Sequence, residues 1–209
     1  MNTCLTATIA PEGAASADLH DTSQPVALHP LEEAMIVGSH PSRKREFALG
    51  RACARAALAE LGIGGTPLPR AQDGAAVWPA GFCGAITHTR GYAAALAAPV
   101  QLFRGLGVDA ERVGAVTPDL FSRLFSLSEI AALESLAPEQ REIAATVLFS
   151  AKESAFKAIS AATGRRPHLA QLEISLGAGE FLVRMAADIS LTGRFIVQAD
   201  LAVTGLGMP

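Results

Sequence analysis

The sequence of 209 residues predicts a mixed α/β fold of the α+β type. The observations that predict it are two helical segments with marked ends, about 43–61 and 138–162, and short apolar runs within 83–108 and 172–204. The length fits one compact body, or two small subdomains that share a core. Half of the residues are apolar and 18% are charged, so the chain can bury a hydrophobic core.

Net charge, cysteine content and hydropathy exclude several classes of protein. With 17 Lys and Arg against 20 Asp and Glu, no chain-wide attraction to nucleic acid or to an anionic membrane is expected. Cys4, Cys53 and Cys83 form no C-x-x-C pair, so we interpret them as buried or incidental thiols. No apolar run reaches the roughly 18 residues of a membrane span, and the N-terminus lacks a basic secretory segment. We therefore expect a cytoplasmic protein.

The N-terminal part of the chain predicts an irregular start followed by a helix. Proline, glycine and small polar residues fill 1–42, where we expect one strand. Ser42 then precedes a stretch rich in Ala, Leu and Arg that Gly62 and Gly64 end, which predicts a helix.

Two sets of residues recur at helical spacing in this segment. The apolar set predicts a buried stripe and consists of Phe47, Ala54, Leu58 and Leu61. The basic set predicts a charged face and consists of Lys44, Arg51 and Arg55. A basic face together with a helix N-terminus favours an anion, and a merely solvated face is the alternative.

The middle of the chain predicts a loop followed by three strands. Turn residues fill 62–79, so we expect a loop with at most a short hairpin near Trp78. Three short apolar runs then predict adjacent strands, at 83–88, 92–97 and 105–108.

The C-terminal part predicts two helices and an antiparallel sheet. The S-x-x-E pattern from Ser126 to Glu129 is typical of a capping box and predicts a helix near 128–136. Pro138 and Gly164 mark the two ends of the longest helix. Alternating runs after it predict the sheet, at 172–176, 181–185, 194–198 and 201–204.

Two carboxylates lie close together in the third apolar run. Asp109 and Glu111 are two apart and share a face of the predicted strand, about 6 to 7 Å apart along the backbone. Because like charges repel, a bound cation is one way to stabilise them. Mg²⁺ fits, since it takes one or two carboxylates and completes its shell with waters and phosphates. A solvated strand end beside Arg112 is the alternative.

Two further groups can contribute to the same chemistry. Glu153 and Lys157 lie at i and i+4 in the long helix, where they form an ordinary surface pair or add a carboxylate and an ammonium to a site for metal and phosphate. Thr87 and His88 end a predicted strand and can donate hydrogen bonds to phosphate oxygens, although a single histidine is also typical of a structural role.

In this order, the segments resemble the 4′-phosphopantetheinyl transferase superfamily, in its surfactin-type branch and closest to the enterobactin synthetase component D proteins. The residues that carry the resemblance are Arg43-Lys44-Arg45-Glu46-Phe47 with Gly50-Arg51, Trp78-Pro79, Ile86-Thr87-His88, Gly107-Val108-Asp109-x-Glu111 and Lys152-Glu153-Ser154-x-x-Lys157. The last two motifs together are quite specific, and the likeness covers most of residues 40–165.

The resemblance implies a Mg²⁺-dependent enzyme that moves the phosphopantetheine arm of coenzyme A onto a serine of an apo acyl or peptidyl carrier protein, releasing adenosine 3′,5′-bisphosphate. It implies a monomer of two similar subdomains related by a pseudo-twofold, each a small, mostly antiparallel sheet packed on a long helix. We expect residues 1–105 on the 3′-phosphate and adenine side of coenzyme A, and 106–209 on the side of the metal and the catalytic helix. The likeness to component D also implies siderophore biosynthesis, within an enterobactin synthase complex.

The resemblance assigns metal and catalytic roles by position. Asp109, Glu111 and Glu153 hold Mg²⁺ against the pyrophosphate. Glu153 is also the candidate base for the carrier serine, with a metal-polarised water as the alternative. Lys157 and His88 contact phosphates and complete the expected catalytic set with Asp109 and Glu153.

The same resemblance assigns the binding of coenzyme A. Arg43 and Arg51 face the 3′-phosphate, Gly74 lies in the loop that runs past the adenine, and Thr87 stands where the family often has serine. Four residues of the catalytic set also contact coenzyme A: His88, Asp109, Glu153 and Lys157.

Two departures and one recognition segment complete the expectations. Ala110 replaces a larger aliphatic residue of the family and should point away from the carboxylates, and Thr87 keeps the hydroxyl of serine. The segment 112–140 is expected to face the carrier protein. The alternatives are another metal-dependent nucleotide-processing enzyme, and a non-catalytic module that binds coenzyme A or carrier proteins.

Overall fold

The computed structural model describes residues 4–20, 23, 25–186 and 189–209. Its strands are β1 (Ala15–Leu19), β2 (Phe82–Thr89), β3 (Tyr92–Pro99), β4 (Gly105–Arg112), β5 (Glu173–Leu176), β6 (Glu180–Met185), β7 (Ile189–Gln198) and β8 (Leu201–Met208). Its helices are α1 (Leu5–Ile9), α2 (Pro30–Glu33), α3 (Pro41–Glu60), α4 (Phe121–Leu124), α5 (Leu127–Glu134) and α6 (Pro138–Thr163), with 3₁₀ turns η1 (Ala34–Ile36), η2 (Pro118–Leu120) and η3 (Leu169–Gln171).

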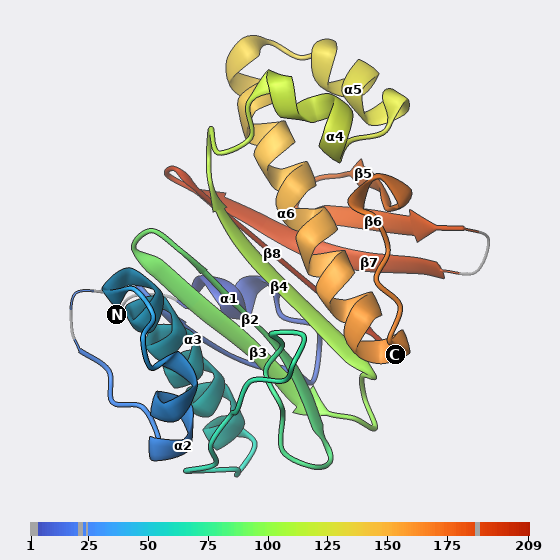
Figure 1. Ribbon diagram of the computed structural model, residues 1–209. Helices are drawn as coiled ribbons and strands as arrows, with labels where there is room; N and C mark the ends of the chain where they lie inside the picture. Colours follow the sequence, from blue (N-terminus) through green and yellow to red (C-terminus); the bar gives the residue numbers. More distant parts are fainter. Residues whose placement is uncertain (1–3, 21–22, 24, 187–188) are drawn as a thin grey trace.

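These elements form two antiparallel sheets, each packed on one long helix, within the described residues (Figure 1). The three-stranded sheet has the order β1-β3-β2 and packs on α3. The five-stranded sheet has the order β4-β8-β7-β6-β5 and packs on α6. The predicted α+β fold class is confirmed.

The helix α3 follows the prediction closely, but its first residue and its basic face do not. The side chain of His40 caps the helix and Pro41 occupies the first turn, so the helix begins before Ser42. Phe47, Ala54 and Leu58 are buried, as predicted, and Ala54 and Leu58 pack against the three-stranded sheet. The alternative interpretation of the basic face, as merely solvated, is wrong for Arg51, which is only 6% exposed.

The long helix α6 has the predicted ends and an unusually close contact with β4. Gly164 ends the helix in the left-handed conformation at φ 69°, which favours glycine. Gly105 and Gly107 lie on the β4 face towards α6, where added Cβ atoms would overlap the carbonyl oxygens of Ala158 and Ser154. Two hydrogens in place of side chains therefore allow helix and strand to approach each other.

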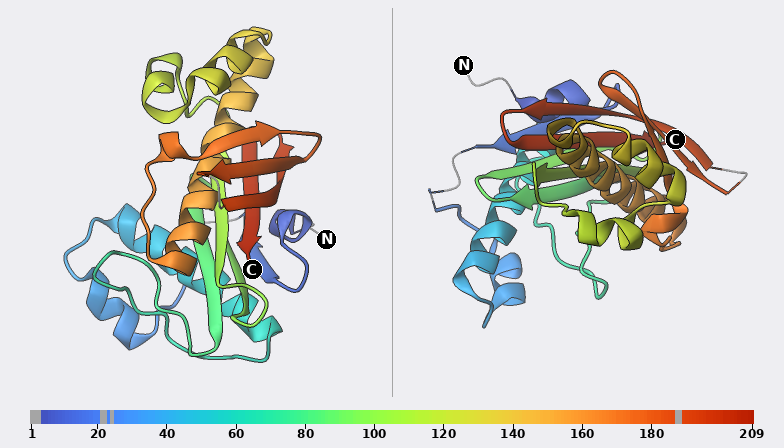
Figure 2. Two further views of the ribbon diagram at one scale, coloured as in Figure 1. Left: turned by 90° about the vertical axis from the view of Figure 1, so that its right-hand side faces the viewer. Right: turned by 90° about the horizontal axis from the view of Figure 1, so that it is seen from above.

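The opposite face of β4 belongs to a different part of the core. Leu106, Val108 and Ala110 pack with α1, β3 and β8 in one hydrophobic cluster, whereas α6 packs in another with β5, β6 and β7. The helices α1 and α6 accordingly cover opposite faces of the five-stranded sheet (Figure 2). Because the side chains on its two faces point into different clusters, β4 lies between the two halves of the molecule.

Two predictions about the sheets were partly wrong. The run at 105–108 was expected beside the strands of 83–97 in one sheet, but β4 pairs with β8 at the edge of the other sheet. It still lies next to β2 without a backbone ladder between them. The irregular start contains the expected strand, β1, together with the helices α1 and α2, which short apolar runs and prolines did not reveal. Residues 1–3, 21–22 and 24 of that start lie outside the described residues.

The predictions for the start of α5, the C-terminal strands and the loop before β2 are confirmed. The capping box joins Ser126 and Glu129 at the start of α5, and the C-terminal strands pair antiparallel. The loop before β2 contains a short hairpin with a bridge between Arg70 and Ala76. The three cysteines are free, and burial raises the pKa of the Cys53 thiol to about 12. No helix of the described chain combines the length and the apolar character that crossing a membrane requires.

Candidate active site

Asp109 and Glu111 occupy the face of β4 that looks towards α6. Gly105 and Gly107 precede them on the same face because side chains alternate along a strand. Ala110 points the other way and is buried in the opposite cluster, as expected. The two carboxylates therefore directly follow, on the same face of β4, the two glycines that contact α6.

Lys157 of α6 binds the first of these carboxylates. Its Nζ donates to Asp109 Oδ1 at 2.8 Å and to the carbonyl oxygen of Val108 at 2.8 Å. Of the two interpretations of Glu153 and Lys157, the ordinary surface pair is thus not the one seen in the described chain, where Lys157 pairs with Asp109 of the strand. Lys157 thus links α6 to β4 at Val108 and Asp109.

Asp109, Glu111 and Glu153 form an acidic cluster in which each carboxylate affects another. Burial, followed by the charge of Asp109, raises the pKa of Glu111 to about 7. Burial and then the charge of Asp109 also raise the pKa of Glu153 above its ordinary value. The helix carboxylate therefore lies within electrostatic range of the strand pair, where the three negative charges repel one another.

One oxygen of this cluster lacks a partner. Asp109 Oδ2 is buried and has no hydrogen-bond partner among the described residues, while Oδ1 accepts from both Lys157 and Thr87. An unpaired buried carboxylate oxygen is costly. Among the described residues, no group of three or more Asp, Glu, His or Cys side chains is arranged closely enough to hold a metal ion. The oxygen donors, their repulsion and the unpaired Oδ2 nevertheless fit a hard cation such as Mg²⁺.

Thr87 and His88 at the end of β2 adjoin the acidic cluster. Thr87 Oγ donates to Asp109 Oδ1 at 3.2 Å. His88 Nε2 lies 3.2 Å from Arg43 Nη1, and because a guanidinium only donates, Nε2 is the acceptor. Burial, with Arg43 and Lys157 nearby, lowers the pKa of His88. The histidine is therefore neutral at pH 7 and stands between the basic helix end and the carboxylates.

Arg43 and Arg51 form the basic side of the site. Arg43, exposed at the start of α3, also approaches Glu46 at 3.4 Å. Arg51 lies two turns further along the helix, where its Nε donates to the carbonyl oxygen of Leu68 at 2.6 Å and its guanidinium stacks on Phe47 at 4.3 Å. Burial lowers the pKa of Arg51 to about 10, so it stays charged at neutral pH.

Gly74 lies near this basic side but apart from the carboxylates. It adopts φ +93° within the short hairpin, and the Arg70 guanidinium lies close to the place that a Cβ would occupy. Next to it, Asp73 pairs with Arg166 at 2.8 Å, beyond the end of α6. The structure thus brings together, at β2, β4 and α6, the residues predicted to bind metal and pyrophosphate. Arg51 and Gly74 lie apart from them, on the neighbouring basic side.

Sequence reasoning missed several charged residues that shape the site. Arg70 contributes to the positive potential that lowers the pKa of Arg51, and only its place in a turn-rich loop marked it. Lys152 was treated only as part of a motif, but it is fully buried and pairs with Glu129 at 2.8 Å. Lys152 also donates to two backbone carbonyls after α6, those of Leu169 and Leu172.

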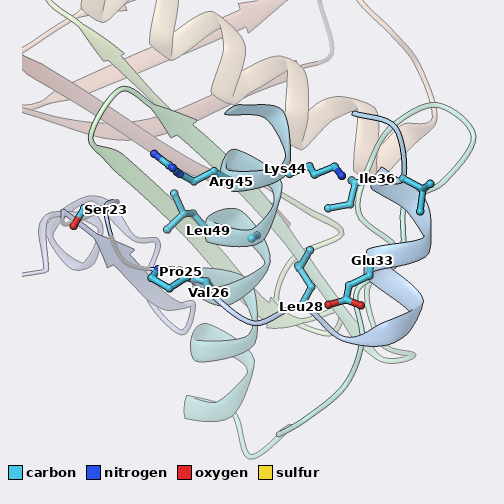
Figure 3. A pocket seen from close by; sticks show the side chains of 11 residues that line it. Ser23, Pro25, Val26, Leu28, Glu33, Ile36, Lys44, Arg45 and Leu49 are labelled. Carbon is cyan, nitrogen blue, oxygen red and sulfur yellow. The ribbon is translucent and has the colours of Figure 1, made fainter. Parts of the chain in front are cut away.

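A hollow of about 530 Å³ lies away from the carboxylates (Figure 3). Lys44, Arg45 and Leu49 line it from α3, with Leu28 and Ile36 from the preceding segment. At 3.6 residues per turn these α3 residues fall on a different face of the helix from Arg43. The hollow therefore does not belong to the acidic cluster.

Comparisons with known proteins match both halves of the chain. Residues 31–98 match a family model described as the 4′-phosphopantetheinyl transferase N-terminal domain, and residues 105–199 match one described as the 4′-phosphopantetheinyl transferase superfamily. The 4′-phosphopantetheinyl transferase PptT of Mycobacterium tuberculosis is 32% identical over 93% of this chain and 92% of its own. The chain belongs to the 4′-phosphopantetheinyl transferase superfamily.

Two other relatives agree with this membership. The 4′-phosphopantetheinyl transferase Npt of Nocardia iowensis is 36% identical over 72% of this chain and 67% of its own, and Svp of Streptomyces mobaraensis is 38% identical over 79% and 69%. The protein is therefore a 4′-phosphopantetheinyl transferase, an enzyme class that takes coenzyme A as substrate and acts on carrier proteins. The solved holo-[acyl-carrier-protein] synthase of Thermotoga maritima covers 51% of this chain and 65% of its own at 19% identity and a TM-score of 0.39, too low a similarity to support an argument.

Proposed function

We propose that this transferase moves the 4′-phosphopantetheine arm of coenzyme A to a serine of an apo acyl or peptidyl carrier protein in a Mg²⁺-dependent reaction. The serine oxygen forms a bond to the β-phosphorus, the bond from that phosphorus to the bridging oxygen breaks, and adenosine 3′,5′-bisphosphate leaves. The single observation that carries the proposal is Asp109, buried between β2, β4 and α6 with one oxygen unpaired in an acidic cluster.

The acidic cluster is the proposed metal site. Asp109, Glu111 and Glu153 would hold Mg²⁺, which neutralises charge on the pyrophosphate when bound. Burial, and after it the charge of Asp109, raises the pKa of Glu111 and Glu153, and a cation among them would offset both effects. Displacement at phosphorus depends chiefly on positioning and charge neutralisation, so this cluster supplies one of its main requirements.

Glu153 is the proposed proton acceptor for the carrier serine. Serine is a weak nucleophile at neutral pH and needs a nearby base. Burial raises the pKa of the Glu153 carboxyl, which makes its carboxylate a stronger base than an ordinary glutamate. Glu153 lies on α6, the helix that also carries Lys157.

The basic groups are the proposed contacts for coenzyme A phosphates. Lys157 and neutral His88 would contact the pyrophosphate, beside Thr87. Arg43 and Arg51 would bind the 3′-phosphate, with Gly74 in the loop near the adenine. In this proposal residues 1–105 hold the 3′-phosphate and adenine side, and residues 106–209 hold the metal and the catalytic helix.

The finer assignment follows the sequence motifs. We place the enzyme in the surfactin-type branch, near enterobactin synthetase component D, with a role in siderophore biosynthesis. We also expect it to be monomeric and cytoplasmic. The segment 112–140, with Leu127 87% exposed, is the proposed surface for the carrier protein.

The test is a transfer assay with a panel of apo carrier proteins. The enzyme is incubated with coenzyme A and MgCl₂, and mass spectrometry measures addition of the phosphopantetheine arm to the carrier serine. Transfer should require MgCl₂ and should disappear when the carrier serine is replaced by alanine. Transfer at full rate after chelation of all divalent ions would remove the proposed metal site, and the ranking of carriers by rate identifies the pathway.

A further inference from the structure

A fully buried carboxylate lies outside the proposed site. Glu32 in α2 has no exposed surface. Its Oε2 accepts from the backbone N–H of His29 at 3.0 Å, its Oε1 from that of Leu68 at 2.9 Å, and Arg55 Nη1 donates to both oxygens at 2.9 and 2.7 Å. Burial alone raises the pKa of Glu32, but these donors bring it below its ordinary value. Glu32 is therefore a buried anion with all of its partners in place.

Leu68 connects this anion to Arg51. The N–H of Leu68 binds Glu32, and its carbonyl oxygen accepts from Arg51 Nε at 2.6 Å. Leu68 itself is fully buried. Both polar backbone groups of one residue are thus held, one by Glu32 and the other by Arg51, so a shift of Leu68 moves the acceptor that orients the guanidinium.

The next residues carry the same restraint into the hairpin. The N–H of Arg70 lies 3.0 Å from the sulfur of Met35, in η1 directly after α2. Arg70 then bridges Ala76 across the hairpin that contains Gly74. The segment from α2 to η1 therefore holds the start of this loop at two backbone N–H groups, those of Leu68 and Arg70.

We propose that Glu32 is a positioning residue for coenzyme A binding, which fixes Arg51 and the hairpin of Gly74 through the backbone of Leu68. The inference rests on the proposed function of Arg51 and Gly74. Glu32 touches neither substrate nor metal in this account. Its carboxylate supplies an acceptor that no neighbouring group of the described chain replaces, so its loss frees the N–H of Leu68 inside the core.

The matched variants are Glu32→Gln and Glu33→Gln, neighbours in α2, of which Glu33 is exposed. Glutamine offers one acceptor oxygen where the carboxylate offers two, so a buried N–H group loses its partner. We expect Glu32→Gln to raise the KM for coenzyme A about tenfold, the size typical of one lost hydrogen bond to a charged group. The KM for the carrier protein and the kcat should not change, and Glu33→Gln should match the wild type in all three values.

Two further measurements separate positioning from a general loss of structure. With dephospho-coenzyme A as donor, Glu32→Gln should lose less than with coenzyme A. In a double-mutant cycle, Glu32→Gln should have little further effect on the KM for coenzyme A once Arg51 is alanine. Additive effects, or equal losses with both donors, would overturn the proposal.

A variant that avoids the buried position covers the case in which Glu32→Gln does not fold. Met35→Ala, at an exposed residue, removes the contact with the N–H of Arg70 and should raise the KM for coenzyme A by a smaller factor. An unchanged KM in the folded variants contradicts the proposal. Absence of transfer by the wild type would instead contradict the proposed function, so the two failures are distinguishable.

Discussion

The two halves of the molecule treat buried charge in opposite ways. On the α3 side, the buried Glu32 accepts from the half-buried Arg55 and from two backbone N–H groups, so both of its carboxylate oxygens are paired. On the α6 side, Asp109 keeps an unpaired oxygen, and the carboxylates of Glu111 and Glu153 repel it. The first arrangement holds a loop in place without any ligand. The second leaves a buried oxygen unpaired among like charges, and this difference marks the place where we propose that a cation binds.

The largest expected effect is at the unpaired carboxylate. Replacing Asp109 with alanine removes the acceptor shared by Lys157 and Thr87. We expect the kcat for phosphopantetheine transfer to fall by about a hundredfold to a thousandfold, as when one preorganised electrostatic group is lost. The carrier mass assay measures this, with the exposed variant Glu12→Gln as control. Turnover close to the wild-type rate in a folded Asp109→Ala variant would contradict the proposed site.

The next effect tests a buried charge of the α6 half that is fully paired. Lys152→Met leaves Glu129 buried without its cation, so we expect a loss of about 3 to 5 kcal/mol in the free energy of unfolding. Urea denaturation measures the loss. Lys44→Met, at an exposed lysine, is the matched control and should change the free energy of unfolding by less than about 0.5 kcal/mol. Similar values for both variants would mean that the buried pair contributes nothing.

A smaller effect is expected on the basic side. Arg51→Ala should weaken binding of coenzyme A about tenfold, the order of one lost hydrogen bond to a charged group. The loss should be less with dephospho-coenzyme A, which lacks the 3′-phosphate. Isothermal titration calorimetry compares the two donors, and Arg45→Ala, on another face of α3, serves as control. Equal losses with both donors would show that Arg51 does not bind the 3′-phosphate.

The smallest effect is a pH dependence of stability in the acidic cluster. Because folding raises the pKa of Glu111 to about 7, the folded protein binds its proton more tightly than the unfolded chain does. The contribution of this group is therefore greatest below its ordinary pKa and is lost as the pH rises through about 7. In chelator, the Tm of the wild type relative to Glu111→Gln should fall by a few degrees between pH 5 and pH 8. A constant difference between the two would contradict the raised pKa that burial and the charge of Asp109 give to Glu111.

Much of the acidic half was predictable because its signals are local. The ends of α6, the capping box at Ser126 and the alternation along β4 are all encoded within a few residues. The close contact at Gly105 and Gly107 follows from the same stretch that carries Asp109. The motif therefore contains both the carboxylate and the reason that a helix can approach it.

The basic half was less predictable because its contacts are distant in sequence. Spacing placed Arg51 on a basic face of the helix but did not predict its burial, where its Nε donates to the carbonyl oxygen of Leu68. Glu32 looked like part of an irregular start, since its partners come from α3 and from the loop before β2. The sheet that β4 joins was also misjudged, because its partner β8 lies at the other end of the chain. Such pairings depend on the tertiary fold and not on local pattern.

The missing side chains at Gly105 and Gly107 set the width of the gap between α6 and β4. A methyl group at either place would act as a wedge and move the catalytic helix outwards, carrying Glu153 away from Asp109 and Glu111. The width of the proposed cation site would thus depend on two residues that contribute no ligand to it. The close packing of α6 on β4 is therefore as important for the geometry of the proposed site as its acidic groups.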